Sequence, residues 1–318
     1  MRCYVAAGLN LSLLLTATKV VNAQTPEIQK EVETRLEVKR LKRVAQNAGA
    51  QPSECASHGF APVDGTRLFY EIKGTGPALV LIHGGQMDSR MWDDQFAVLA
   101  KQFFVIRYDV RGYGGSFQPD QLYSDAADLV ALLDYLKVKK AHVVGLSLGG
   151  RIAIDFAVAH PQRVTSLTLA GPGLSGYEPP QSEETDLRMW NLIKAARDEG
   201  PDKVTELWLK DPFMAPAMEQ PRLVPQLQKL ARENAHCWLT NPVLQRPPKP
   251  APAKRLSDIK VPTLLVLGDR DVPQSKATIE TLEKGIAGAK KVVIKGAGHM
   301  VNMEKPEEFN EALLSFIR

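Results

Sequence analysis

The fold of this chain is decided by the stretch Gly145-Leu146-Ser147-Leu148-Gly149-Gly150. It follows directly on the apolar run from Ala141 to Val144 and precedes a helical pattern over Arg151 to Ala159. A serine between glycines at a strand-to-helix junction is typical of a nucleophile elbow, because side chains at the glycine positions of so sharp a turn would collide with the neighbouring strand and helix. Such a turn lifts the hydroxyl clear of the sheet and aims it at the positive end of the helix. The pattern predicts Ser147 as a nucleophile rather than an ordinary helix-capping serine.

Apolar strands alternate with amphipathic helices on both sides of this turn. A hairpin is predicted around Asp64-Gly65. Six further strands are predicted at 78–82, 103–108, 142–144, 164–169, 263–267 and 291–294, with helices at 91–101, 124–137, 151–159, 276–284 and 306–317. Continuous apolar strands separated by such helices indicate a mostly parallel, doubly wound α/β sheet of eight strands, covered on both faces. The hairpin is expected to add an antiparallel edge.

The alternation breaks between residues 174 and 254, where the sequence shows helical stretches and no strand. The prolines of the segment 246–252 make the return to the sheet stiff and extended. We interpret residues 174–254 as a helical cap over the active-site end of the strands. The core is expected to comprise residues 59–173 and 255–318.

The first residues have the features of a secretory leader. Met1-Arg2 is a short basic start, the following stretch is apolar, and Val21-Asn22-Ala23 offers small residues before a cut after Ala23. The apolar run is too short for a membrane anchor, which needs ~20 residues. Residues 1–23 are therefore predicted to be a cleaved signal peptide, which predicts a secreted or periplasmic protein. Residues 24–58 are predicted to form an N-terminal helical arm.

Composition restricts the partners of the mature chain. The sequence of 318 residues is 44% hydrophobic and 24% charged, typical of a globular protein with a substantial core. Loss of Arg2 and Lys19 with the leader lowers the formal charge from +4 to +2. This is too little to suggest nucleic acid as a partner. Cys55 and Cys237 remain, either as a disulfide or as two free thiols.

A serine nucleophile needs a histidine base that a carboxylate orients, and in an open α/β sheet these follow in the order serine, acid, histidine. Of the six histidines, only His299 lies after the last strand and before the final helix, in a glycine-rich loop. The acid is expected just past the strand 263–267, where Asp269 and Asp271 are both candidates.

These motifs resemble the α/β-hydrolase superfamily over residues 59–318, and in detail its capped esterase, enol-lactonase and peroxidase-like branch. The resemblance implies that Asp271, the last residue of a G-x-x-D turn, is the acid. It also implies an oxyanion hole formed by the backbone N–H groups of Leu148 and Gly85, the latter in the loop His83-Gly84-Gly85-Gln86. His83 is expected to be structural. The loop Asp109 to Ser116 resembles the superfamily's D-x-R-G-x-G-x-S motif, which implies a turn held by an Asp/Arg network.

The resemblance implies a serine hydrolase that cleaves a carboxylic ester or lactone through the triad Ser147, Asp271 and His299. No metal or organic cofactor is required. Cap side chains are expected to form their own core or an apolar substrate wall; these are Trp190, Trp208, Phe213, Met214 and Trp238. A carbon–carbon bond hydrolase with the same triad is the alternative. A non-catalytic binding protein is disfavoured, because all three triad residues are present.

Overall fold

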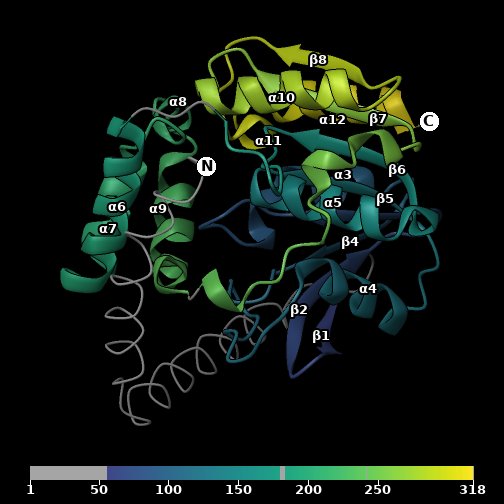
Figure 1. The fold of residues 1–318 in the computed structure, drawn as a ribbon, viewed down its shortest axis with the longest axis horizontal. Helices are drawn as coiled ribbons and strands as arrows, with labels where there is room; N and C mark the ends of the chain where they lie inside the picture. The colour runs from purple at the N-terminus through teal and green to yellow at the C-terminus, as the bar shows by residue number, and fades with distance from the viewer. Residues whose placement is uncertain (1–55, 180–182, 241, 318) are drawn as a thin grey trace, which may run out of the picture. The chain divides into compact units, whose positions relative to one another are not determined.

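The structure is a computed structural model that describes residues 56–179, 183–240 and 242–317 (Figure 1). The predicted signal peptide, Cys55 and nearly all of the predicted arm lie outside the described residues, so these expectations stay predictions. The first strand begins at Ser57. The sheet therefore starts slightly before the expected boundary at Gly59.

Within the described residues, eight strands form one sheet in the order β1-β2-β4-β3-β5-β6-β7-β8. The strands are β1 (Ser57–Val63), β2 (Thr66–Lys73), β3 (Ala78–Ile82), β4 (Phe104–Tyr108), β5 (Ala141–Leu146), β6 (Val164–Ala170), β7 (Thr263–Gly268) and β8 (Lys290–Ile294). The pairs β1–β2 and β2–β4 are antiparallel and the others are parallel. The predicted fold class, a mostly parallel sheet with an antiparallel hairpin at its edge, is confirmed.

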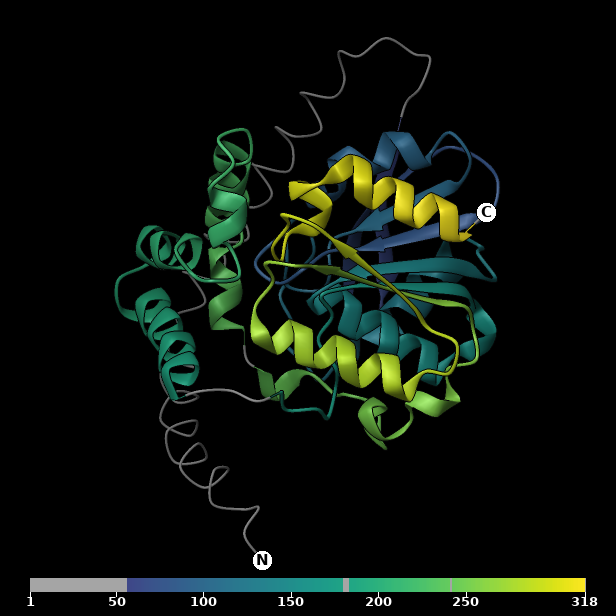
Figure 2. The same cartoon turned by 90° about the horizontal axis from the view of Figure 1, so that it is seen from above.

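Helices follow most strands and cover the sheet on both faces. The core helices are α3 (Asp93–Leu99), α4 (Asp125–Tyr135), α5 (Leu148–Ala159), α10 (Pro273–Gly285), α11 (Val301–Glu304) and α12 (Pro306–Ile317). Figure 2 shows α12 on one side of the sheet and α10 on the other.

Alternation along the buried strands explains the two layers, since successive side chains of a strand point to opposite faces. Leu79 and Leu81 of β3 belong to a cluster with apolar residues of α3 and α12. Val80 and Ile82 belong to a second cluster with residues of α4, α5 and α10. A strand buried on both faces needs an unbroken apolar run, as the sequence has here.

The stretch between β6 and β7 is helical, and we call it the cap. Its helices are α6 (Glu183–Asp198), α7 (Pro201–Leu209), α8 (Ala215–Met218) and α9 (Val224–Glu233), followed by a 3₁₀ helix, Ala235–Leu239 (Figure 1). Buried cap side chains such as Val204, Met214 and Leu227 join the same apolar cluster as α3 and α12. In the described part of the chain, no helix is both long and apolar enough to cross a bilayer.

Candidate active site

Ser147 occupies a strained turn between β5 and α5. Its φ of 55° and ψ of −112° lie in a region that residues with a side chain rarely adopt. Three backbone hydrogen bonds hold it there: its N–H donates to Ala170 O (2.9 Å), and its carbonyl accepts from Arg151 N (3.0 Å) and Gly173 N (2.9 Å). The fold thus fixes a half-buried hydroxyl at the carboxyl end of β5.

The flanking glycines are required by close packing. A Cβ at Gly145 would lie 2.2 Å from Gly149 O, and one at Gly149 would lie 2.1 Å from Ile82 O. Both obstacles are backbone atoms, so a side chain at either position would force α5 away from the sheet.

His299 and Asp271, from the loops that follow β8 and β7, meet in the interior. His299 Nδ1 lies 3.0 Å from Asp271 Oδ1 and 3.1 Å from Oδ2, and both side chains are nearly fully buried. Ser275 Oγ also lies 3.3 Å from Nδ1. With Nδ1–H donating to the carboxylate, Nε2 is left to accept a proton.

The other candidate acid, Asp269, stabilises a turn instead of binding His299. It is exposed, and its Oδ1 accepts from Gly296 N at 2.7 Å, which closes the turn before the His299 loop. Arg270 reaches the cap, where its Nη1 and Nη2 each lie 2.7 Å from an oxygen of the Glu219 carboxylate. Of the two candidate acids, Asp271 is the one that contacts the histidine.

Gly171 packs against the His299–Asp271 pair, and the residue before it binds the serine backbone. A Cβ on Gly171 would lie 2.8 Å from Asp271 Oδ2 and 3.1 Å from His299 Nδ1. The preceding residue is Ala170, whose carbonyl binds Ser147 N. No hydrogen bond within the described residues joins Ser147 Oγ to His299; such bonds are often long without substrate and shorten in the reactive complex.

The predicted oxyanion donors lie at the same edge of the sheet. The N–H groups of Leu148 and Gly85 donate to no group in the described ranges, whereas Gly84 N donates to Met91 Sδ (3.1 Å). A Cβ on Gly84 would lie 3.6 Å from the Ser147 Cβ, and one on Gly85 would meet open space. Two N–H groups without partners in this part of the chain, one at the start of α5 and one in the loop after β3, therefore lie beside the serine.

His83 is fully buried and holds this loop to the next one. Its Nδ1 lies 2.7 Å from Gly84 O, and its Nε2 accepts from Val110 N at 2.9 Å. Burial lowers the pKa of His83, which keeps the ring neutral and suits one donor and one acceptor nitrogen. These bonds support the expected structural role.

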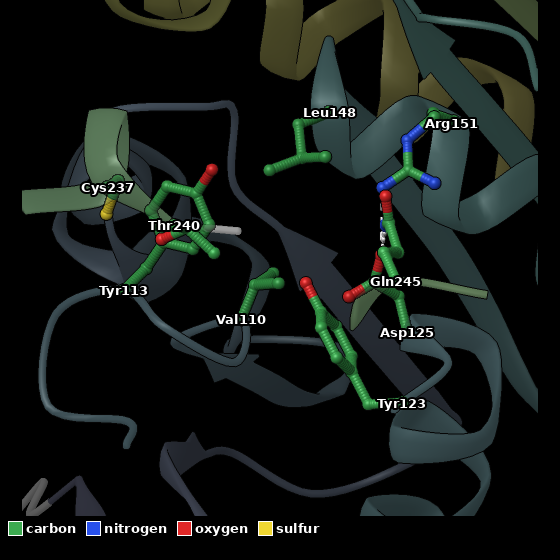
Figure 3. A pocket seen from close by; sticks show the side chains of 9 residues that line it. All are labelled: Val110, Tyr113, Tyr123, Asp125, Leu148, Arg151, Cys237, Thr240 and Gln245. Carbon is green, nitrogen blue, oxygen red and sulfur yellow. Dashed lines mark hydrogen bonds and ion pairs between the residues drawn. The ribbon is translucent and has the colours of Figure 1, made fainter. Parts of the chain in front are cut away.

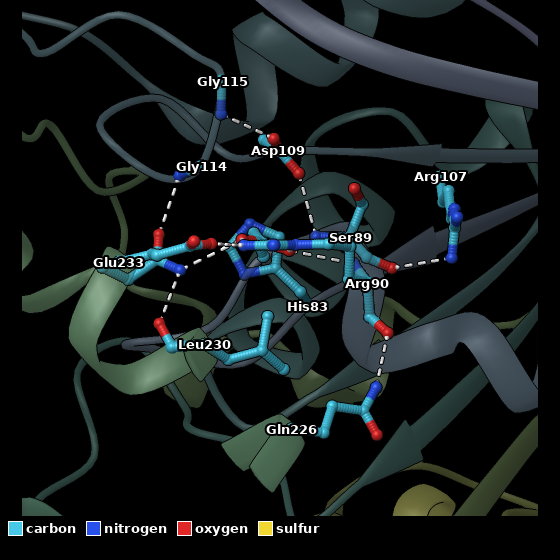
Figure 4. A network of polar contacts seen from close by, with 12 residues as sticks. His83, Ser89, Arg90, Arg107, Asp109, Gly114, Gly115, Gln226, Leu230 and Glu233 are labelled. Atoms are coloured by element: carbon cyan, nitrogen blue, oxygen red, sulfur yellow. Dashed lines mark hydrogen bonds and ion pairs between the residues drawn. The ribbon is translucent and has the colours of Figure 1, made fainter. Parts of the chain in front are cut away.

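The loop after β4 is held by two separate sets of contacts, where the sequence suggested one Asp/Arg network. Asp109 accepts from Ser89 N (2.8 Å) and Gly115 N (2.7 Å) (Figure 4). Arg111 instead forms a bidentate pair with Asp128 of α4, at 2.7 Å for each bond. The spacing of an Asp and an Arg in a loop does not reveal partners from another helix.

The cap is joined to the same loops through Asn234, which follows α9. Asn234 Oδ1 accepts from Gly114 N (2.8 Å), and its Nδ2 donates to Asp88 Oδ2 (3.1 Å) and Leu230 O (3.0 Å). Arg90 adds an ion pair to Glu233 at 2.7 Å, seen in the same view (Figure 4). A buried amide that satisfies both its donor and its acceptor positions the cap on the core.

One aromatic side chain of the cap reaches the histidine. The Phe213 ring lies 4.6 Å from the His299 ring in an edge arrangement, and Trp208 lies 6.2 Å from Phe213 and 5.4 Å from Trp238. Met214 is fully buried in the apolar cluster, while Trp190 is 45% exposed. Phe213 therefore contacts the site, Trp208 and Trp238 pack behind it, and Trp190 belongs to the surface.

Glu304, at the end of α11, holds the histidine loop and was not anticipated from the sequence. Its buried carboxylate accepts from Gly298 N (2.7 Å) and Met300 N (2.9 Å), the residues on either side of His299. Burial raises its pKa, and the two N–H donors oppose that rise. The one available signal was an acidic residue directly after Met303, but its burial is a tertiary property.

Cys237 is a buried free thiol whose Sγ donates to Gly112 O (3.1 Å). Its alternative partner, Cys55, lies outside the described residues. Among residues 56–179, 183–240 and 242–317, no three His, Cys, Asp or Glu side chains are grouped as metal ligands.

A family profile described as the Alpha/beta hydrolase family matches residues 79–312. The chain belongs to this family. A 2-hydroxy-6-oxononadienedioate/2-hydroxy-6-oxononatrienedioate hydrolase of Burkholderia vietnamiensis is 31% identical over 278 residues, which cover 80% of this chain and 93% of that protein.

Two solved structures are also similar. The enol-lactonase of Burkholderia xenovorans LB400 has a TM-score of 0.68 at 29% identity, over 81% of this chain and 99% of that one. A thermophilic esterase of Thermogutta terrifontis has a TM-score of 0.70 at 26% identity, over 83% of this chain and 98% of that one. These likenesses support a hydrolase and leave the bond that it cleaves open.

Replacement of Gly149 by alanine tests the packing of the turn. Because the new methyl group would overlap Ile82 O, Gly149→Ala is expected to destabilise the protein by about 3 kcal/mol. This corresponds to a melting temperature lower by roughly 6–12 °C. Gly85→Ala is the control, since its Cβ meets open space. Equal thermal denaturation midpoints for the two variants would contradict the packing argument.

Replacement of Glu304 by glutamine tests the support of the histidine loop. Glutamine offers one acceptor oxygen where two N–H groups point, so one hydrogen bond to a charged group is lost. Turnover is expected to fall about tenfold, with a smaller change in KM. The control is Glu311→Gln, at an exposed position of α12. Identical steady-state constants for both variants would show that Glu304 does not support the site.

Proposed function

We propose that this protein is a serine hydrolase that cleaves a carboxylic ester or lactone through an acyl-enzyme. The observation that carries the proposal is the buried hydrogen bond between His299 Nδ1 and Asp271, next to a serine held in a strained turn. A buried carboxylate fixes the tautomer and orientation of the imidazole and stabilises its charged form. The histidine is thereby prepared to act as a base.

The proposed reaction begins when His299 Nε2 removes the proton of Ser147 and the oxygen attacks the substrate carbonyl. The N–H groups of Gly85 and Leu148 stabilise the negative charge that develops on the carbonyl oxygen. His299 then gives its proton to the leaving alcohol. Water, deprotonated by the same histidine, releases the acid and restores the serine.

A carbon–carbon bond hydrolase is the second candidate, because one relative of 31% identity bears the name of a dienedioate hydrolase. Such substrates carry free carboxylates, which a site would match with uncommitted cations. Arg188 of the cap pairs with Asp211 (2.6 Å), which also accepts from Phe213 N (3.0 Å), and the exposed Arg270, next to Asp271, pairs with Glu219. Because both arginines are already paired with carboxylates, they favour an ester or lactone over a substrate that carries free carboxylates.

Substitution of Ser147 by alanine removes the proposed nucleophile. Hydrolysis of p-nitrophenyl esters by the purified protein should fall by roughly three to six orders of magnitude, to the level that binding and the oxyanion donors supply. Ser257→Ala, at an exposed position, should behave as the unchanged protein does. Near-normal turnover by Ser147→Ala would refute the proposed function.

Substitution of each candidate acid by asparagine separates their roles. Asp271→Asn presents an N–H₂ group to His299 and favours the wrong tautomer, so ester turnover should fall by about four orders of magnitude. Asp269→Asn keeps an oxygen that can accept from Gly296 N and should cost much less. The comparison uses kcat at saturating ester for both variants. A larger loss for Asp269→Asn would transfer the acid role to that residue.

A further inference from the structure

A cavity of about 160 Å³ lies beside Leu148, the residue after the serine (Figure 3). Its lining joins the loop after β4, the starts of α4 and α5, and the end of the cap. The lining residues are Val110, Tyr113, Tyr123, Asp125, Leu148, Arg151, Cys237, Thr240 and Gln245. A cavity of roughly 150 Å³ accommodates benzene, so this one has room for about six non-hydrogen atoms.

The position of the cavity in the sheet indicates which part of the substrate it would bind, the acyl group or the leaving alcohol. Along the sheet the strands run β4-β3-β5-β6-β7-β8. Ser147 follows β5 and His299 follows β8, whereas the lining residues Val110 and Tyr113 follow β4. Along the sheet, the cavity and the histidine therefore lie on opposite sides of the serine. The leaving alcohol must lie near the histidine that protonates it. The acyl group then extends the other way, past Leu148 and into the cavity.

Two phenol groups offer hydrogen-bond donors inside this cavity. Figure 3 shows the rings of Tyr113 and Tyr123 on either side of Val110, with both hydroxyls directed toward the Leu148 side. In the described part of the chain, neither hydroxyl has a hydrogen-bond partner, and both side chains are half-buried. Burial raises the pKa of each phenol, so both stay protonated at neutral pH. Val110 and Leu148 supply the apolar surface between them.

The charges around the cavity do not suit an anion. Arg151 is the cation of the lining, and its guanidinium already binds Asp125 Oδ2 (2.8 Å) and Asp155 Oδ2 (3.2 Å). Gln245 donates to the same Asp125 oxygen. Burial raises the pKa of Asp155 to about 6, so Asp155 is ionised at pH 8 and its charge opposes that of the Arg151 guanidinium. A carboxylate entering the cavity would find no unpaired positive charge.

We propose that this cavity binds the acyl group of the substrate and selects a neutral acyl chain of about six non-hydrogen atoms that carries a hydrogen-bond acceptor, bound by Tyr113 and Tyr123. This inference rests on the proposed function, because it takes Ser147 as the nucleophile and His299 as the proton donor to the leaving group. It narrows the substrate to esters or lactones of oxygenated, uncharged acids. It disfavours the dicarboxylate that the carbon–carbon alternative requires.

Three p-nitrophenyl esters of matched length test the selection: hexanoate, 5-oxohexanoate and the monoester of glutarate. They present a methylene, a ketone and a carboxylate at nearly the same place in the chain. At pH 8, with the uncatalysed rate subtracted, kcat/KM for the 5-oxohexanoate should exceed that for the hexanoate about fivefold, the value of a neutral hydrogen bond. The glutarate should be at least about tenfold poorer than the hexanoate, because its charge stays unpaired.

The double variant Tyr113→Phe/Tyr123→Phe removes both donors and keeps both rings. Its ratio of kcat/KM for 5-oxohexanoate to hexanoate should fall to about one. The matched control is Tyr135→Phe, a half-exposed position at the far end of α4, which should keep the ratio of the unchanged protein. A ratio of two substrates on one preparation does not depend on the folded fraction, so partial unfolding cannot imitate the result.

Asp125→Asn tests the role of charge, because it removes one of the two negative charges that pair with Arg151. The deficit of the glutarate relative to the hexanoate should shrink at least about threefold, since the guanidinium gains capacity for an anion. A 5-oxohexanoate preference that the double variant retains would overturn the role of the two phenols. A glutarate preference in the unchanged protein would overturn the selection of neutral chains.

The variant Ser147→Ala distinguishes failure of the proposed function from failure of the proposed acyl selection. If this variant still cleaves all three esters, the proposed function fails. If it is inactive but the unchanged protein shows no preference among the esters, the proposed function stands and the acyl selection fails.

Discussion

The arrangement of the site depends on one backbone constraint, the left-handed turn at Ser147. A residue in such a conformation costs about 1–3 kcal/mol and persists only where its surroundings determine it fully. Here the surroundings are backbone atoms: Ala170 O, Gly173 N and Arg151 N bind the serine, while Gly145 and Gly149 allow α5 to approach β3 and β5. This strained turn places the half-buried hydroxyl at the carboxyl end of β5 and leaves the N–H of Leu148 without a hydrogen-bond partner in the described residues.

The cap contributes to this site as well as covering it. Its apolar residues are continuous with the cluster under α3 and α12, and Asn234 binds loops that follow β3 and β4. At the other side, Phe213 contacts His299, and Arg222 donates to Met303 O (2.5 Å) near the end of the histidine loop. Glu304 also supports the histidine loop, because its carboxylate accepts hydrogen bonds from Gly298 N and Met300 N. His299 is therefore held between core and cap, so a shift of the cap would change its position.

The features that the sequence predicted well are local ones. The central strand β3 is an unbroken apolar run, the hairpin has its Asp64-Gly65 turn, and the serine turn carries its glycines within five residues. The choice between Asp269 and Asp271 was not local; it came from resemblance, and the structure supplies its geometric counterpart in the bond to His299.

The contacts that the sequence missed join residues far apart in the chain. Arg111 binds Asp128 rather than Asp109, Glu304 binds the loop around His299, and two tyrosines converge on a cavity with Gln245 of the cap. Side-chain type indicates that a tyrosine or a carboxylate can form hydrogen bonds. Which partner such a side chain finds depends on how helices and loops pack against one another. The hydrophobic periodicity that predicts individual helices and strands does not give this packing.

The central claim is that one serine hydroxyl is activated by the buried His299–Asp271 pair. The most direct measurement treats the ester-hydrolysing protein with a fluorophosphonate and locates the adduct by peptide mass spectrometry. The account predicts one covalent adduct, on the peptide that contains Ser147, formed in step with the loss of esterase activity. An adduct on another residue that abolishes activity while Ser147 stays unmodified would contradict it.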